Sequence, residues 1–250
     1  MLRSIAHPLW SATYRLTGKR IQTTLHIDDM AMVAGVFAAD AAAAQRRMPS
    51  ADLRVVEFEP GRTEIQIVAL DYRRVRPLRP YRELAMVVPV ELRLHDGVPE
   101  RGTAVLHLPV TTEEARSAGV VSFGQPKIVA DVDLLARPGE VEATLSAHGV
   151  HVLTLEVDEL PVMRQRNHRV SFTLRDDHRL VASDFDAEGE IGISADPGGA
   201  RLVLGPHAIA AGLRELGIEL ESRAHLYAPR LEGRISKPRV VGETAAEPVH

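Results

Sequence analysis

The chain has 250 residues, 45% of them hydrophobic, which is enough for one sizeable core, and its formal net charge is −4. This charge argues against nucleic acid as a partner, and no apolar run approaches the roughly 20 residues of a membrane span or forms a signal-peptide core. The absence of cysteine excludes disulfides, thiolate catalysis and sulfur-ligated metals. We therefore expect a cytoplasmic protein without membrane partners, bound metal or cofactor.

Short runs of alternating apolar and polar residues predict a mainly β protein. Gly, Pro and Asp separate the runs, as in hairpin-linked antiparallel strands. Many strands with few helices favour a barrel or a sandwich, and a closed barrel would enclose a small-molecule pocket. The predicted strands span residues 53–58, 64–70, 84–94, 103–108, 142–147, 150–157, 169–174, 190–194 and 225–235.

Three segments have helical rather than strand character. The first is rich in strong helix formers and follows two capping candidates, Asp28 and Asp29. The second begins with threonines followed by two glutamates, which is typical of a capped start. The third has Pro206 at a plausible first helical position and ends before Gly217. The predicted helices cover residues 29–46, 111–118 and 206–216.

No break in composition divides the chain. We expect a single domain over residues 1–239 and a disordered tail over residues 240–250, where no continuous pattern remains.

Three segments carry a family resemblance. They are "YRELAMVVPV", "SAGVVSFGQPKIVADVDLL" and "RLVLGPHAIAAGLRELGIELESRAHLYAPRLEGRI", within a stretch from about residue 15 to 238. On these residues the chain resembles the acetoacetate decarboxylase superfamily. The resemblance implies an antiparallel β-barrel with a few peripheral helices, and a homo-oligomer.

The family's chemistry depends on a lysine that forms a Schiff base with a ketone-bearing acid. The family pattern there is Ser-Ala-Tyr-Pro-Lys-Lys-x-Gly-x-Pro-Lys, and the first lysine forms the imine. An ungapped match places Val120 on the proline and Val121 and Ser122 on the two lysines. Lys127 then matches the second Pro-Lys, which does not hold the imine. Moving Lys127 inward would displace the strand that follows. This register predicts that the imine lysine is lost.

The resemblance also implies other site residues. Glu83 matches the family's active-site glutamate, and if buried it could move protons. The family uses an arginine near its first strand to hold the substrate carboxylate, and Arg20 is the candidate here because a guanidinium binds carboxylates bidentately. Glu64 lies near a second acidic position of the family. An ion pair at the barrel mouth is the alternative role for Glu83.

The leading hypothesis is a lyase-like or cyclase-like enzyme that acts on a small oxo-acid or polyketide-like carbonyl compound without a lysine, in secondary metabolism. Glu83 would be the acid or base, Arg20 would bind an anion, and Val120, Val121 and Ser122 would line the cavity. Dehydration and aldol-type bond making are among the reactions that would fit. One alternative is a non-catalytic binder of small molecules. A second is a decarboxylase that uses Lys127 as the Schiff-base nucleophile.

Overall fold

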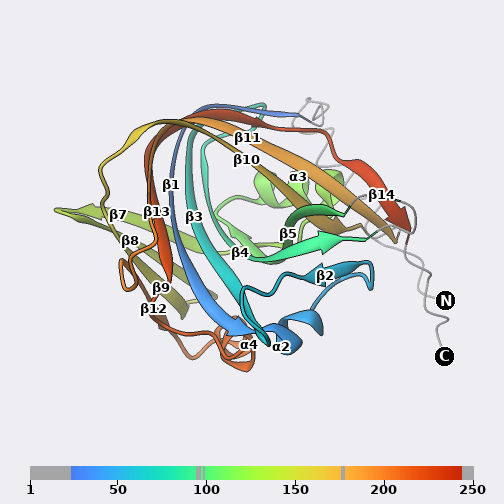
Figure 1. Cartoon of the computed structure of the whole chain (residues 1–250). Helices are drawn as coiled ribbons and strands as arrows, with labels where there is room; N and C mark the ends of the chain where they lie inside the picture. Colours follow the sequence, from blue (N-terminus) through green and yellow to red (C-terminus); the bar gives the residue numbers. More distant parts are fainter. Residues whose placement is uncertain (1–23, 94–96, 98, 176–177, 244–250) are drawn as a thin grey trace.

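The computed structural model describes residues 24–93, 97, 99–175 and 178–243. Its main element is a closed β-barrel (Figure 1). Around the barrel the strand order is β4-β3-β1-β13-β11-β10-β5, and β5 pairs again with β4 to close it. These strands are β1 (Leu25–Asp40), β3 (Arg62–Arg76), β4 (Tyr81–Leu92), β5 (Glu100–Val110), β10 (Met163–Leu174), β11 (Arg179–Ser194) and β13 (Ala224–Ile235).

The barrel is mixed rather than purely antiparallel as predicted. β5 runs parallel to β10 and also parallel to the short strand β6 (Lys127–Val129), whereas the other neighbours in the barrel are antiparallel. Two further strands extend the sheet. β2 (Leu53–Val55) pairs with β4, and β14 (Arg239–Glu243) pairs with β11. The predicted tail is therefore ordered as far as Glu243, and its remainder lies outside the described residues.

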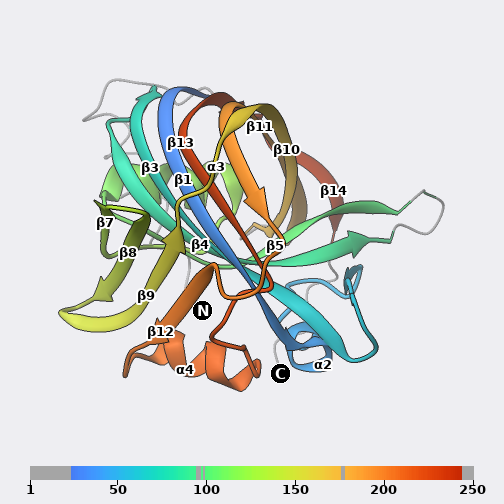
Figure 2. The ribbon, with the colours of Figure 1, turned by 60° about the vertical axis from the view of Figure 1, so that its left-hand side comes forward.

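A second sheet of four antiparallel strands packs beside the barrel (Figures 1 and 2). Its order is β12-β9-β8-β7, and its apolar face shares one buried cluster with residues of β1, β3 and β4. Alternating burial along β8 and β9 produces that face. The strands are β7 (Asp131–Arg137), β8 (Glu140–Ala147), β9 (Val150–Asp158) and β12 (Ala200–Leu204).

The helix predicted over 29–46 is wrong for most of its length. This segment forms β1, which pairs with β3 on one side and β13 on the other, and only α2 (Ala41–Gln45) is helical. Asp40 caps α2, while Asp28 pairs with Arg76. Alanine and methionine are strong helix formers, but helix propensity amounts to less than about 1 kcal/mol per residue, and the pairing of β1 with two long strands overrides it.

The other two predicted helices are confirmed. α3 (Glu113–Phe123) begins at Thr112, whose hydroxyl accepts a hydrogen bond from the Ala115 amide. α4 (Ala208–Glu215) begins at His207, whose Nδ1 accepts from the Ile209 amide. α2 and α4 lie close together at one end of the molecule (Figure 2) and are joined by an ion pair between Arg47 and Glu215. No helix in the described ranges is long and apolar enough to cross a membrane.

Candidate active site

The barrel encloses a cavity of about 160 Å³. Most of its wall is apolar, and β1, β3, β4, β5, β11 and β13 all contribute to it. The polar wall residues are Gln66, Glu83, Thr103, Gln125, Asn167, Arg169 and Ser171. A small apolar pocket with a few convergent polar groups is the usual form of a small-molecule site.

Strand alternation places Glu83 in this cavity. Successive side chains of a strand point to opposite faces, so Glu83 shares the inner face of β4 with Ala85 and Val87. On the neighbouring strand β3, Leu70 is the register partner of Glu83 and also lines the cavity. The Glu83 carboxylate is therefore surrounded mainly by apolar wall.

Lys127 pairs with Glu83. Its Nζ donates a hydrogen bond of 2.7 Å to Glu83 Oε2, and the two side chains are only 4% and 9% exposed. Burying an ion pair costs a large desolvation free energy, so a buried pair at a cavity wall indicates a functional role rather than a contribution to stability. The ungapped register predicted no amine beside Glu83, and on this point the sequence interpretation is wrong.

The end of α3 positions Lys127. Gly124 takes the left-handed conformation that terminates the helix, with φ of 63°, and its amide donates to the Val120 carbonyl. Three residues later Lys127 opens β6 opposite Leu108 of β5. Gly119 has no side chain to occupy the space that the methylene groups of Lys127 fill.

The register error has a physical cause. The prediction treated the chain after Lys127 as one continuous strand, in which an inward Lys127 would reverse the facing of later residues. The structure breaks that strand at Ala130, so β6 belongs to the barrel sheet and β7 to the second sheet. In one continuous strand, residues an odd number of positions apart face opposite sides. Because the strand is broken, Lys127 and Val132 are both buried although they are five positions apart.

Two buried tyrosines pack beside the ion pair. Tyr72 and Tyr81 stack with ring centroids 4.5 Å apart, and Lys127 Nζ lies 5.4 Å from the Tyr81 centroid. Burial raises the pKa of both hydroxyls well above the usual value, and the charge of Glu83 adds to the effect. Both tyrosines therefore remain neutral.

The other predicted site residues lie elsewhere. Val120, Val121 and Ser122 are half-buried in α3 and are not among the residues that line the cavity. Glu64 is half-buried on β3, one alternation step beyond Gln66, and does not line it either. Arg20 lies outside the described residues.

Sequence reasoning missed the polar wall of the cavity. Asn167, Arg169 and Ser171 line it from β10, and Gln125 lines it from the link between α3 and β6. The spacing of the three β10 residues, two apart, was a usable signal, but the predicted strand began only at residue 169. Among the described residues, no group of three or more His, Asp or Glu side chains is arranged to hold a metal ion.

A family model described as "Acetoacetate decarboxylase (ADC)" matches residues 12–235. A search of curated proteins gave no match.

Solved structures share the fold. An acetoacetate decarboxylase from Legionella pneumophila is 14% identical with a TM-score of 0.66, covering 90% of this chain and 91% of its own. The enduracididine biosynthesis enzyme MppR complexed with pyruvate is 17% identical with a TM-score of 0.65, covering 88% and 90%. MppR was also solved with the condensation product of pyruvate and imidazole 4-carboxaldehyde. An acetoacetate decarboxylase-like enzyme from Sphingomonas wittichii is 16% identical with a TM-score of 0.56, covering 88% and 92%. Because the family model spans nearly the whole chain and the fold agrees, this chain belongs to the acetoacetate decarboxylase family.

Proposed function

We propose that this protein is a lyase that forms an imine between Lys127 and a small oxo-acid, with Glu83 as the acid and base. The observation that carries the proposal is the buried 2.7 Å hydrogen bond between the Lys127 amine and the Glu83 carboxylate. This replaces the lysine-independent chemistry that the ungapped register favoured. It agrees with the alternative in which Lys127 is the nucleophile.

The pair supplies both reagents that imine formation needs. Transfer of one proton from Lys127 Nζ to Glu83 Oε2 converts the ion pair into a neutral amine and a carboxylic acid, and neutral groups are the ones that burial penalises least. The free amine attacks the carbonyl carbon of the substrate, and the acid protonates the oxygen that leaves as water. Glu83 lines the mostly apolar cavity, and the Lys127 side chain is buried against it without being among the residues that line the cavity; this burial favours the proton transfer.

The imine then accepts the electrons of a breaking carbon–carbon bond. In a decarboxylation, the bond to the carboxylate breaks, carbon dioxide leaves, and the electron pair moves through the new carbon–carbon double bond to the imine nitrogen. Protonation of the resulting enamine at carbon, followed by hydrolysis, releases the ketone and restores Lys127. With pyruvate an enamine forms instead when the Glu83 carboxylate removes a proton from the methyl group of the imine, and this enamine can attack an aldehyde. The two MppR complexes, with pyruvate and with its condensation product, support that branch.

Borohydride trapping tests the proposal. The protein is incubated with acetoacetate or pyruvate and sodium borohydride, and the adduct is mapped by mass spectrometry. We expect an adduct on Lys127, none in Lys127→Met, and none on the surface lysine Lys237, which serves as the internal control. Loss of turnover with an intact fold is expected for Glu83→Gln.

Two results would overturn the imine. Turnover without an adduct on Lys127 would return the assignment to lysine-independent chemistry. A ligand that raises the unfolding temperature and is recovered unchanged would identify a non-catalytic binder. A homo-oligomeric state and a cytoplasmic location remain predictions, which light scattering and cell fractionation would test.

A further inference from the structure

The barrel wall is loosely closed between β5 and β10. These strands pair at only two positions, Ser171 with Thr103 and Phe172 with Ala104. Among the described residues, the part of β10 before Ser171 pairs with β11 alone. Gly102 allows the close approach where pairing begins, since a Cβ there would lie 2.6 Å from the Val170 carbonyl oxygen. Before Thr103 on β5 and Ser171 on β10, no pair joins the two strands among the described residues.

A second hollow adjoins this part of β5 and β10. It is lined by residues of β4, β5 and β10, and it shares Gln66, Thr103 and Arg169 with the barrel cavity. Because the same three side chains line both, the two spaces adjoin there. Arg169 is exposed, so the two spaces meet at a residue on the surface.

Arg169 is the cation at this junction. Along β10 the side chains at alternate positions Asn167, Arg169 and Ser171 line the cavity, whereas Arg166 points away from it and pairs with Glu188. The Arg169 side chain is exposed, and it makes no ion pair or hydrogen bond with any described residue.

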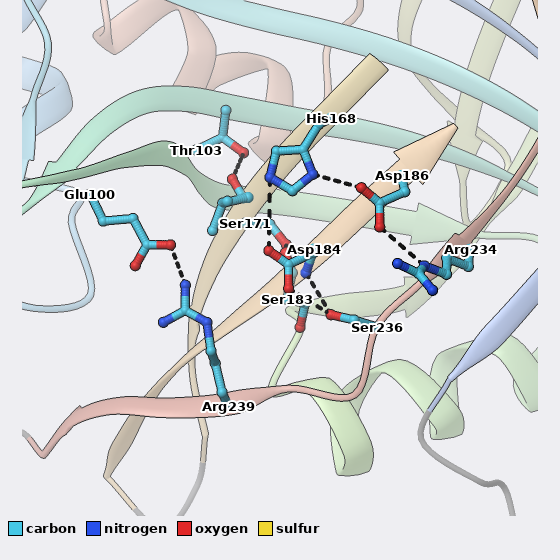
Figure 3. Close-up of polar contacts among 11 residues, drawn as sticks. Glu100, Thr103, His168, Ser171, Ser183, Asp184, Asp186, Arg234, Ser236 and Arg239 are labelled. Carbon is cyan, nitrogen blue, oxygen red and sulfur yellow. Dashed lines mark hydrogen bonds and ion pairs between the residues drawn. The ribbon is translucent and has the colours of Figure 1, made fainter. Parts of the chain in front are cut away.

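Other cationic side chains, from β10, β13 and β14, are already paired (Figure 3). His168 contacts Asp186 at 2.7 Å, and Arg234 contacts the same carboxylate at 3.1 Å. Arg239 pairs with Glu100. Unlike these three residues, Arg169 lines the cavity and has no carboxylate partner among the described residues.

Arg169 is too far from Lys127 to bind the carboxylate next to the reacting carbonyl. Ser171 pairs with Thr103, and Lys127 pairs with Leu108, five residues further along β5. Arg169 lies two residues before Ser171 on β10, so about seven residues of strand separate it from Lys127. At about 3.3 Å per residue this is roughly 23 Å between backbones, and on the order of 10 Å remains even if both side chains extend toward each other.

We propose that Arg169 binds an anionic group at the far end of the substrate, so that the substrate is an oxo-acid with an apolar chain ending in a second carboxylate. This rests on the proposed imine at Lys127, which fixes the reacting end. The wall between the two ends includes Val68, Val87 and Val105, which suit an alkyl chain. A guanidinium binds a terminal carboxylate through two parallel hydrogen bonds.

Binding of a matched ligand pair tests this inference. Dissociation constants for 2-oxodecanedioate and 2-oxodecanoate, which differ only in the terminal carboxylate, are measured by calorimetry. The proteins are the wild type, Arg169→Gln and Arg166→Gln. Arg166→Gln is the control, because it removes the same charge from the outer face of the same strand. Thermal unfolding confirms that each variant is folded.

We expect the wild type to prefer the dicarboxylate, and Arg169→Gln to reduce that preference about tenfold, as for loss of one charge-assisted contact. Arg166→Gln should leave the ratio of the two constants within about twofold. An equal ratio in wild type and Arg169→Gln would overturn the inference. Trapping with pyruvate in the wild type reports on the imine separately, since pyruvate cannot reach Arg169. If no pyruvate adduct forms but Arg169→Gln still changes the ratio of the two dissociation constants, only the proposed function is rejected.

Discussion

Gly119 in α3 lies against the side chain of Lys127 so closely that a Cβ at Gly119 would be 2.4 Å from Lys127 Cδ and 2.6 Å from Cε. The helix thus passes the lysine at a position where only glycine leaves room. The methylene groups of Lys127 have little alternative space on that side, and their path leads Nζ to Glu83.

Gly119→Ala should therefore displace Lys127 from Glu83. We expect the yield of borohydride adduct on Lys127 to fall at least about tenfold, which corresponds to roughly 1.4 kcal/mol lost from the reactive geometry. Gly212→Ala in α4 is the matched control, because nothing lies within 4 Å of its added Cβ and alanine favours helix. An adduct yield in Gly119→Ala equal to the control would show that the contact does not position the lysine.

The Lys127–Glu83 pair should show strong coupling in stability. Lys127→Met leaves Glu83 buried without its partner and should lower the free energy of unfolding by about 3 kcal/mol. The double variant Lys127→Met with Glu83→Gln removes both charges. Its loss of unfolding free energy should therefore be smaller than the sum of the two single losses, and the difference should exceed about 1 kcal/mol. Urea unfolding of all four proteins measures this difference. Additive losses would mean that the two groups are not paired in solution.

The β architecture could be predicted because apolar and polar residues alternate along the strands, and this alternation indicates which side chains are buried. The predicted strands at 64–70 and 103–108 lie within β3 and β5, and the strand predicted over 84–94 coincides with β4 as far as Leu92. The segment 29–46 misled the prediction because its alanines and methionines favour helix locally, while its strand form depends on β3 and β13, which are distant in sequence.

The site was only partly predictable for a related reason. Glu83 could be placed in the pocket because its strand alternates and matches a family position. Lys127 could not, because its direction depends on where α3 ends and on a break in the following strand at Ala130. Arg169 was missed since its significance lies in the divergence of β10 from β5, a tertiary feature that no local pattern encodes.

Tyr81→Phe should not destabilise the protein. The Tyr81 hydroxyl is buried and makes no hydrogen bond of good geometry with any described residue; the Tyr72 hydroxyl is its nearest polar neighbour. Its removal therefore relieves a desolvation cost that is poorly compensated. We expect the free energy of unfolding to rise by up to about 1 kcal/mol, with the ring contacts to Tyr72 and Lys127 retained. Tyr227→Phe is the control; it removes a hydroxyl whose long 3.3 Å hydrogen bond to Glu159 is exposed to solvent, so it should change stability little. A clear loss in Tyr81→Phe would reveal a partner for this hydroxyl in solution.

His225 should make stability depend on pH. The ring is buried, and neither nitrogen has a hydrogen-bond partner in the part of the chain that is described. Burial lowers the pKa of His225 below its ordinary value, although Asp158 and Asp196 partly oppose the shift. The folded state therefore resists protonation, while the unfolded chain binds a proton near pH 6.5. Below that pH the unfolded state holds more protons, so stability should fall as the pH falls. Above it both states are neutral at this residue, and the effect disappears.

His225→Leu should weaken this dependence. We expect the drop in unfolding temperature between about pH 7.5 and about pH 5 to be smaller in His225→Leu than in the wild type. Part of the drop should remain, because burial also lowers the pKa of His107. His26→Gln, at an exposed position on β1, is the control and should keep the wild-type drop. An undiminished drop in His225→Leu would mean that the imidazole already finds a proton-accepting partner in the folded protein, and that its burial does not govern the acid sensitivity of the fold.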